Sequence, residues 1–362
     1  MKKTFKNLAC LFIATLAIVS CDSVGDDNEL NYGAGPYVAQ FSTAAKTGFF
    51  LKDDNEVFNF DIPLELVGGN GLAVDSDLNL TFGEAKDLDK EINNLIKDGY
   101  KIKLQLLDHH ISGKKSSETF PWYYLDDKRC ATKIVYDYMF EEYEGFDCNT
   151  TSWLSPLVDA INAVDIWLEH EVKNFEFGKV LMSMITKVRE INNILFADLN
   201  RDFRCYLLKK AAKYIDIVDG HIKLDNDVHF IKKDFLKLND RDDTLDNLSA
   251  NYLVKTLENV KGNLTVIYKG HKGLLTYCLG SISIPANAFL RANPEYDFFI
   301  DINKKGNASL RADGKVDVAL MATKLANGGG HVNASGCKFE DFKEVIDFNE
   351  VKTYIQNKLN KI

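Results

Sequence analysis

The sequence lacks paired cysteines, a surplus of positive charge and any apolar run long enough to cross a membrane comfortably. Its seven cysteines form no Cys-x-x-Cys pair and no short regular spacing, which argues against a cysteine zinc site and a disulfide framework. The formal net charge of −9 argues against non-specific binding of duplex nucleic acid, whose phosphates attract basic surfaces. A small nucleotide remains possible, because a metal ion and a few cationic side chains can hold one phosphate.

What the sequence does have is the composition of a globular protein. Apolar residues make up 46% and charged residues 27% of its 362 positions, so the chain can bury more than one core. We expect two or three domains on length alone. The cysteines of the last three-quarters lie among apolar residues and are interpreted as reduced core residues, which is typical of a cytoplasmic protein.

The first residues favour a different location. Lys2, Lys3 and Lys6 precede an apolar run over residues 8–19, and Cys21 follows shortly after it. A basic start, a short apolar run and small residues before a break are typical of a secretory signal. Cys21 resembles the lipidated cysteine of a bacterial lipoprotein, so residues 1–21 are predicted to be a lipoprotein signal peptide. A buried N-terminal helix is the alternative.

Residues 22–83 are predicted to contain a polar tether and a partial β-sandwich module. Apolar and polar residues alternate in four segments, as they do in half-buried strands. These segments are Tyr37–Phe41, Phe49–Lys52, Val57–Val67 and Leu78–Phe82. The arrangement resembles the first immunoglobulin-like module of surface lipoproteins from Bacteroides-type bacteria, in architecture rather than in any sharp motif.

From residue 84 onward, the pattern alternates between helix and strand. Helices are predicted at 84–97, 129–143, 154–170, 176–214, 285–292, 316–326 and 349–359, and strands at 101–107, 264–269, 273–281 and 296–302. This order predicts an α/β fold with parallel-rich sheets. We expect two α/β lobes joined by helices, over residues 84–215 and 216–362.

Three residues with metal-binding side chains directly follow the predicted strand at 101–107. They are Asp108, His109 and His110. In open α/β sheets, ligands gather at the carboxyl ends of the strands, where these side chains can bind a divalent metal and orient water or phosphate. Asp165, in an apolar helical segment, favours such a site because a metal offsets the burial of a carboxylate. Each of these two features has an alternative when it is taken singly. Asp108, His109 and His110 could form a surface loop, and Asp165 could be a solvated or helix-capping aspartate.

Near the C-terminus, three consecutive glycines precede a histidine. The segment is Gly328, Gly329, Gly330 and His331. Glycines let the backbone approach a ligand closely and expose N–H groups to an anion. Upstream, Arg311 offers a bidentate guanidinium to a phosphate. The segment therefore predicts an anion-binding site, with an accidental loop as the alternative.

Taken together, these residues resemble the DHH superfamily of phosphoesterases, more narrowly its oligoribonuclease (nanoRNase) and cyclic-nucleotide phosphodiesterase branch. The resemblance covers about residues 84–362. It implies hydrolysis of phosphodiester bonds in short single-stranded RNA or small nucleotides, with two manganese ions in the first lobe and nucleotide binding by the second. It also implies that His109 and Asp165 are metal ligands, that Asp108 and His110 belong to the catalytic set, and that Arg311 and Gly328–His331 bind substrate.

The sequence departs from the family pattern upstream of Asp108. No histidine precedes His109, and the closest acidic segment, residues 75–77, is expected to lead into a strand rather than a helix. We therefore expect a truncated catalytic lobe that holds at most one weakly bound manganese ion and has impaired activity. A lipoprotein head fused near residues 78–84 would account for the truncation.

Two other readings of the function remain open. The chain could be a surface-anchored lipoprotein, held at the membrane through lipidated Cys21, whose C-terminal region only binds nucleotides or is inert. If the fusion is not natural, the region from residue 84 is expected to be cytoplasmic.

Overall fold

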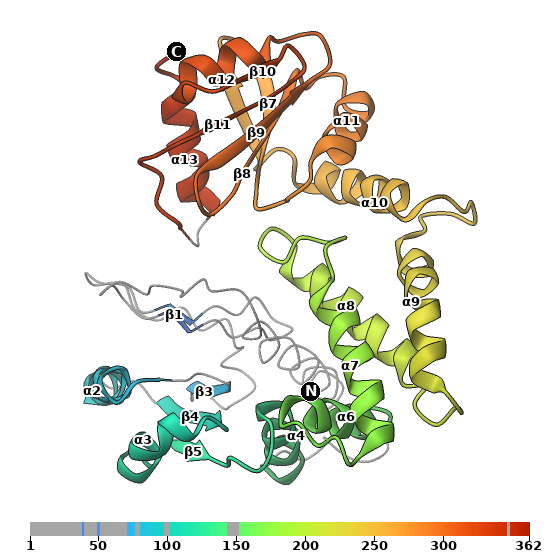
Figure 1. Cartoon of the computed structure of the whole chain (residues 1–362). Coiled ribbons are helices and arrows are strands. Elements are labelled where there is room, and N and C mark those ends of the chain that lie inside the picture. The colour runs from blue at the N-terminus through green and yellow to red at the C-terminus, as the bar shows by residue number, and fades with distance from the viewer. Residues whose placement is uncertain are drawn as a thin grey trace. The chain divides into compact units, whose positions relative to one another are not determined.

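The computed structural model describes residues 38–39, 49–50, 71–76, 80–97, 102–142, 152–345 and 348–362. The predicted signal peptide with Cys21 and most of the predicted sandwich strands lie outside these residues, so they stay predictions. The chain divides into two compact units, residues 1–188 with 198–228 and residues 189–197 with 229–362, and each is described by itself (Figure 1). Among the described helices, none combines the length and the apolar character that crossing a membrane requires.

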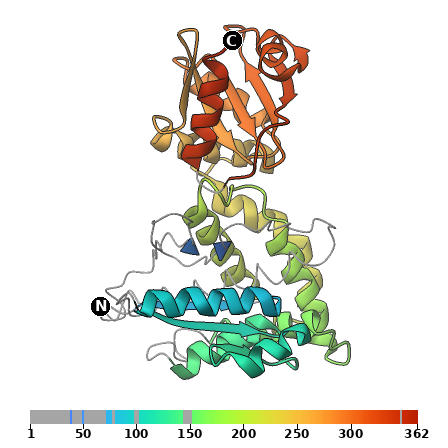
Figure 2. The same ribbon diagram turned by 90° about the vertical axis from the view of Figure 1, so that its left-hand side faces the viewer.

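The first unit contains a three-stranded parallel sheet. Strands β3 (Gly71–Ser76), β4 (Ile102–Asp108) and β5 (Tyr123–Leu125) lie in this order, and both pairings are parallel. Helix α2 (Phe82–Lys97) joins β3 to β4 and lies along the sheet (Figure 2), so the three elements form a β-α-β unit. Strands β1 (Val38–Ala39) and β2 (Phe49–Phe50) form a separate antiparallel pair.

The start of α2 corrects two expectations about the first unit. The N–H of Glu84 donates to Thr81 Oγ1 at 3.3 Å, while Glu84 Oε2 accepts from the N–H of Thr81 at 2.8 Å. This capping box starts a helix at Phe82, so the strand predicted over residues 78–82 is wrong at its described end. Residues 75–76 end β3, the next described element is helix α2, and β3 pairs in parallel with one edge of β4.

The other elements that the structure describes in the first unit are helices, the last of which extends beyond residue 228 into the second unit. They are the short η2 (Ile111–Gly113) and α3 (Lys114–Thr119), then α4 (Ala131–Glu142), α6 (Ser155–Asp165), α7 (Val172–Thr186) and α8 (Ala197–Ala211), followed by α9 (Gly220–Leu236). The helix predicted over 176–214, for which a break near residues 197–198 was the alternative, is divided into α7 and α8, and α8 begins at Ala197. Asn192 Oδ1 accepts from the N–H groups of Ile194 and Leu195 at 2.9 and 2.7 Å, a local turn that interrupts helical hydrogen bonding.

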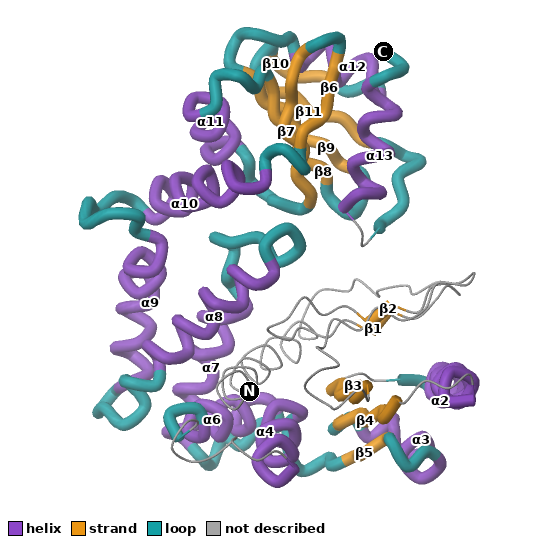
Figure 3. Tube along the Cα trace, turned by 180° about the vertical axis from the view of Figure 1, so that it is seen from behind, coloured by secondary structure: helices purple, strands orange, loops and turns teal. Residues whose placement is uncertain are grey.

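The second unit is built on a six-stranded sheet in the order β10-β11-β9-β8-β7-β6. The strands are β6 (Thr265–Tyr268), β7 (His271–Tyr277), β8 (Phe298–Ile302), β9 (Asn307–Ala312), β10 (Gly329–His331) and β11 (Ala334–Lys338). The helices are α10 (Leu245–Val260), α11 (Ser283–Ala292), α12 (Val318–Ala326) and α13 (Phe348–Leu359). Figure 3 shows α11 and α13 on opposite sides of this sheet.

Successive side chains of β8 lie on opposite faces of the sheet. Phe298 and Ile300 pack with α12 and α13, whereas Phe299 packs with α10 and α11. The α/β fold is confirmed, but the parallel-rich sheet expected for this lobe is wrong. Within it only β7 and β8 pair in parallel, because α11 gives them a crossover, while short turns such as residues 269–270 force antiparallel pairing.

Candidate functional site

The carboxylate of Asp108 lies at the carboxyl end of β4 and is fully buried. Its Oδ1 accepts from the N–H groups of His109 and His110 at 2.8 and 3.2 Å and lies 2.8 Å from His110 Nδ1, while the hydroxyl of Tyr123 donates to Oδ2. Burial alone would raise the pKa of Asp108, but these hydrogen bonds outweigh it and hold the pKa below its ordinary value. Asp108 is therefore a buried anion that orients His110.

Tyr123 and Gly113 build the wall behind this carboxylate. Burial and the neighbouring Asp108 raise the pKa of Tyr123, which keeps its hydroxyl a donor. A Cβ atom at Gly113 would overlap that hydroxyl, so glycine is required where η2 passes β5. Contacts from β4, β5 and η2 therefore hold the turn that follows β4.

His109 and Asp165 come together from β4 and α6. His109 Nδ1 lies 3.9 Å from Asp165 Oδ2, and the two side chains are 17% and 9% exposed. Helix α6 is held in place by Asn162, whose Oδ1 accepts from the N–H of Cys130 at 2.8 Å, and by Gly178 of α7, where a Cβ would overlap the carbonyl of Ala160. The sequence pattern could indicate each residue, and the structure brings the pair together.

This pair fits a divalent metal ion in donor chemistry and spacing. Two ligands at about 2.1 Å from one ion can lie at most about 4.2 Å apart, so a separation of 3.9 Å is compatible with a shared ion. Imidazole nitrogen and carboxylate oxygen are both common ligands of first-row metals. Within the described part of the chain, no group of three or more histidine, cysteine, aspartate or glutamate side chains converges in this way.

A third acidic position lies at this edge, in the segment 75–77 that the sequence pattern was expected to place before a strand and not at the end of one. In the parallel pair of β3 and β4, Asp75 is in register with Leu106 and Ser76 with Leu107. The carboxyl ends of these strands therefore lie side by side, and Asp75 is at the same sheet edge as Asp108. Two signals could have revealed it: an apolar run over residues 71–74 directly before Asp75, and the Thr-x-x-Glu box that starts the next helix.

In the second unit, Arg311 and His331 lie in one row across three strands. Arg311 of β9 pairs with Ala334 of β11, which pairs with His331 of β10. Directly opposed residues of antiparallel strands share a face, so both side chains are on the face that carries α11. Arg311 Nη2 donates to Ser283 Oγ at the start of α11, at 3.0 Å.

The three glycines before His331 have different roles. A Cβ at Gly328 would overlap the carbonyl of Gly336, and Gly330 has φ +147° and lies against Ala334. The close approach of β10 and β11 accounts for these two. A Cβ at Gly329 would meet nothing within 4 Å, so at this position the sheet leaves open space beside the arginine and histidine row.

Asp301 of β8 holds the loop that leads into α11. It is 4% exposed, and its Oδ1 accepts from Thr276 Oγ1 at 2.8 Å and from the N–H of Leu279 at 3.0 Å. The loop contains left-handed residues at Cys278 (φ +56°) and Gly280 (φ +87°). Burial raises the pKa of Asp301 to about 6, against the lowering effect of these hydrogen bonds.

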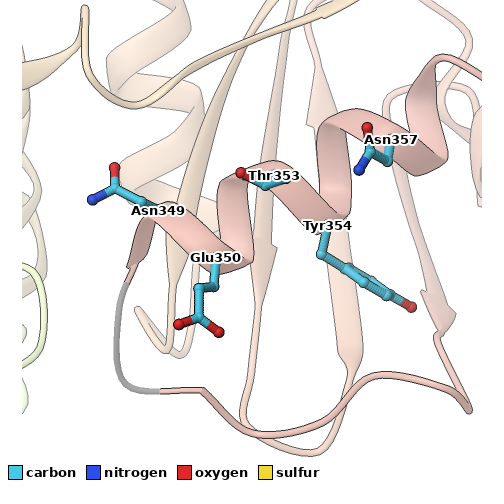
Figure 4. A pocket seen from close by; sticks show the side chains of 5 residues that line it. All are labelled: Asn349, Glu350, Thr353, Tyr354 and Asn357. Atoms are coloured by element: carbon cyan, nitrogen blue, oxygen red, sulfur yellow. The ribbon is translucent and has the colours of Figure 1, made fainter. Parts of the chain in front are cut away.

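A depression on α13 is unrelated to these residues. It is lined by Asn349, Glu350, Thr353, Tyr354 and Asn357, all from one helix (Figure 4). The hydroxyl of Tyr354 donates to Asp341 Oδ1 at 2.8 Å. The depression is the polar face of α13 and holds none of the predicted site residues.

The predicted site residues thus fall into two sets, one in each unit. Asp108, His109, His110 and Asp165 belong to the first unit, and Arg311 with Gly328–His331 to the second. The structure brings together the members within each set.

No protein-family model matches the chain. The chain is 42% identical over 285 residues to a 3',5'-cyclic-nucleotide phosphodiesterase from Helicobacter pylori, a match that covers 79% of the chain and 82% of that relative. It also resembles the crystal structure of an uncharacterized protein from Helicobacter pylori, with a TM-score of 0.70 and 43% identity over 80% of this chain and 83% of that one.

Proposed function

Because the chain belongs to the family of the 3',5'-cyclic-nucleotide phosphodiesterase from Helicobacter pylori, we propose that it is a metal-dependent phosphodiesterase of the DHH type acting on small nucleotides. Family membership supports a phosphodiesterase activity. The observation that carries the residue-level proposal is the 3.9 Å approach of His109 Nδ1 to Asp165 Oδ2 at the carboxyl edge of a parallel sheet.

In this proposal, His109 and Asp165 hold a divalent ion, with manganese as the expected metal. When bound, such an ion supplies Lewis acidity toward a phosphate ester. The neighbouring strand β3 ends at the same sheet edge, with Asp75 in register with Leu106 of β4.

His110 is assigned to proton transfer. Its Nδ1 is directed at the ionised Asp108, so its ring is fixed and its Nε2 is directed the other way. A histidine whose ring is oriented by a buried carboxylate can exchange a proton with a phosphate-ester oxygen. Asp108 acts here through His110 and not as a metal ligand, since its oxygens accept four hydrogen bonds from His109, His110 and Tyr123.

In the second unit, Arg311 and His331 are proposed to bind the substrate. The guanidinium is held toward α11 by Ser283, and the open space at Gly329 lies in the same sheet. A guanidinium and an imidazole on one face suit a phosphate group. The substrate is a cyclic nucleotide or a short single-stranded oligoribonucleotide.

The test uses purified chain, manganese, and either 3',5'-cyclic AMP or a fluorescent diribonucleotide. His109→Ala and Asp165→Asn are expected to lose at least about a hundredfold in kcat/KM, a loss typical of removing a group that stabilises charge in the transition state. Asp159→Asn is the matched control, because Asp159 is on the same helix and pairs with Lys133 at 3.3 Å outside the set. Absence of turnover with manganese, magnesium, cobalt and zinc would remove the proposal.

A further inference from the structure

Helix α6 ends in a Schellman motif that carries a tryptophan where glycine is usual. Its C-cap is Ile166, the N–H of Leu168 donates to the carbonyl of Ala163 at 2.7 Å, and the N–H of Trp167 to that of Val164 at 3.4 Å. Trp167 has φ +61°, in the left-handed region. Bulky residues rarely adopt this conformation, whereas glycine does so without steric penalty.

Packing does not account for this tryptophan. Its side chain is 67% exposed, so most of the ring gains nothing from the core. The ring meets Phe175 edge-on, at 5.2 Å between centroids and 82° between planes, and this contact leaves most of the tryptophan exposed. A strained backbone that presents an exposed indole points to a role of that ring in binding.

The position of Trp167 relates it to the proposed metal pair. It follows Asp165 by two residues, so their Cα atoms are at most about 7 Å apart. Asp165 is in turn 3.9 Å from His109. An exposed indole here is close to the point where the phosphate would react. Its distance from that point is similar to the distance between the phosphate and the base of a nucleotide.

We propose that Trp167 is the base-stacking residue of the site, so that it selects nucleotides over phosphodiesters without a base. This inference rests on the proposed function, because it takes the His109 and Asp165 pair as the place where phosphate reacts. Stacking of one base on an aromatic side chain is sequence-tolerant, since every base offers a π-face. A platform of this kind would accept both purine and pyrimidine nucleotides.

The decisive variant is Trp167→Gly, because glycine suits the backbone and removes the ring. It is expected to raise KM for 3',5'-cyclic AMP about five- to a hundredfold, the range of one base stack. Its midpoint of urea unfolding should stay the same or rise, which is the opposite of what a structural tryptophan would give. Trp167→Phe should restore most of the affinity.

Two controls separate stacking from other effects. The base-free 3',5'-cyclic phosphate of 1,2-dideoxyribose should be hydrolysed equally by the parent and Trp167→Gly. Trp153→Phe leaves Trp167 in place, so the KM for 3',5'-cyclic AMP should stay unchanged. Equal changes of KM for both substrates, or no change for either, would overturn the inference.

Intrinsic fluorescence tests the same point without turnover. The chain has three tryptophans, and AMP should quench the parent and Trp153→Phe but not Trp167→Phe. If the chain proves inactive yet Trp167 is still quenched by AMP, the proposed function fails and the stacking role stands. Unchanged quenching in Trp167→Phe, or a loss of self-association in Trp167→Gly without a change in nucleotide binding, would assign the ring to a protein contact instead.

Discussion

The substitution Asp301→Asn is expected to stabilise the protein at neutral and alkaline pH. The carboxyl group is 4% exposed and its pKa is raised to about 6 by burial. In the unfolded chain the pKa is about 3.9, so folding favours the protonated form by about 2 units, or about 3 kcal/mol. Asparagine resembles that protonated form, since it keeps an acceptor oxygen for Thr276 and Leu279 and carries no charge.

The sign of the pH dependence follows from this difference. Because the folded pKa is higher than the unfolded one, the folded state binds more protons between about pH 4 and pH 6, and stability falls as the pH rises through this window. Above pH 6, the ionised Asp301 lowers the free energy of unfolding by the full amount of about 3 kcal/mol. At pH 4.5 this loss is about 1 kcal/mol. Asp301→Asn should therefore exceed the parent by about 3 kcal/mol at pH 8 and by about 1 kcal/mol at pH 4.5.

Urea unfolding followed by circular dichroism at pH 4.5, 6 and 8 measures this difference. Asp297→Asn is a control of opposite sign. Burial would raise the pKa of Asp297, but hydrogen bonds from His271 and the N–H of Lys272 lower it, so this variant should lose stability at pH 8. A difference between Asp301→Asn and the parent that is constant with pH, or a variant less stable at pH 8, would refute the reasoning.

Three further outcomes are expected. Thr81→Ala removes half of the capping box of α2 and should lower the free energy of unfolding by about 1 kcal/mol. Urea unfolding measures this loss, and Thr119→Ala is a control at an exposed helix end. Gly113→Ala should displace the hydroxyl of Tyr123 from Asp108 and lower kcat, and a fully active variant would show that the tyrosine does not support the site. Arg311→Lys keeps the charge but loses the forked geometry and the bond to Ser283, so KM should rise roughly tenfold with little change in kcat, and an unchanged KM would place substrate binding elsewhere.

The sequence was most informative where periodicity and local chemistry agree. The helix predicted at 349–359 is α13 at 348–359, and the strand predicted at 101–107 is β4 at 102–108, directly before the histidine pair. Apolar spacing marks these elements because each buries one continuous face or run. It could not show that His109 meets Asp165, since that contact depends on how α6 packs against α4 and α7.

The pairing direction of strands and the starts of helices were harder to predict from the sequence. The sheet of the second unit was expected to be parallel-rich, but the left-handed residues Lys269 and Gly270 make a tight turn that forces β6 and β7 to pair antiparallel. The glycines at 328 and 330 were interpreted as ligand contacts, yet the backbone of the neighbouring strand accounts for both. In each case the deciding contact is between backbones, and side-chain patterns carry little information about it.

The placement of β3 bears on the impaired activity expected for the first unit. That expectation rested on the lack of a histidine before His109 and on the acidic segment 75–77, which was expected to lead into a strand and not to end one. However, β3 ends at residues 75–76, pairs in parallel with β4 and leads into α2 through a capping box. An aspartate at the end of the neighbouring strand is the arrangement that an open parallel sheet uses to gather ligands at one edge. What remains of the departure from the family pattern is the absence of a histidine before His109, so the expectation of an impaired site now depends on residues upstream of β3 and not on a missing strand.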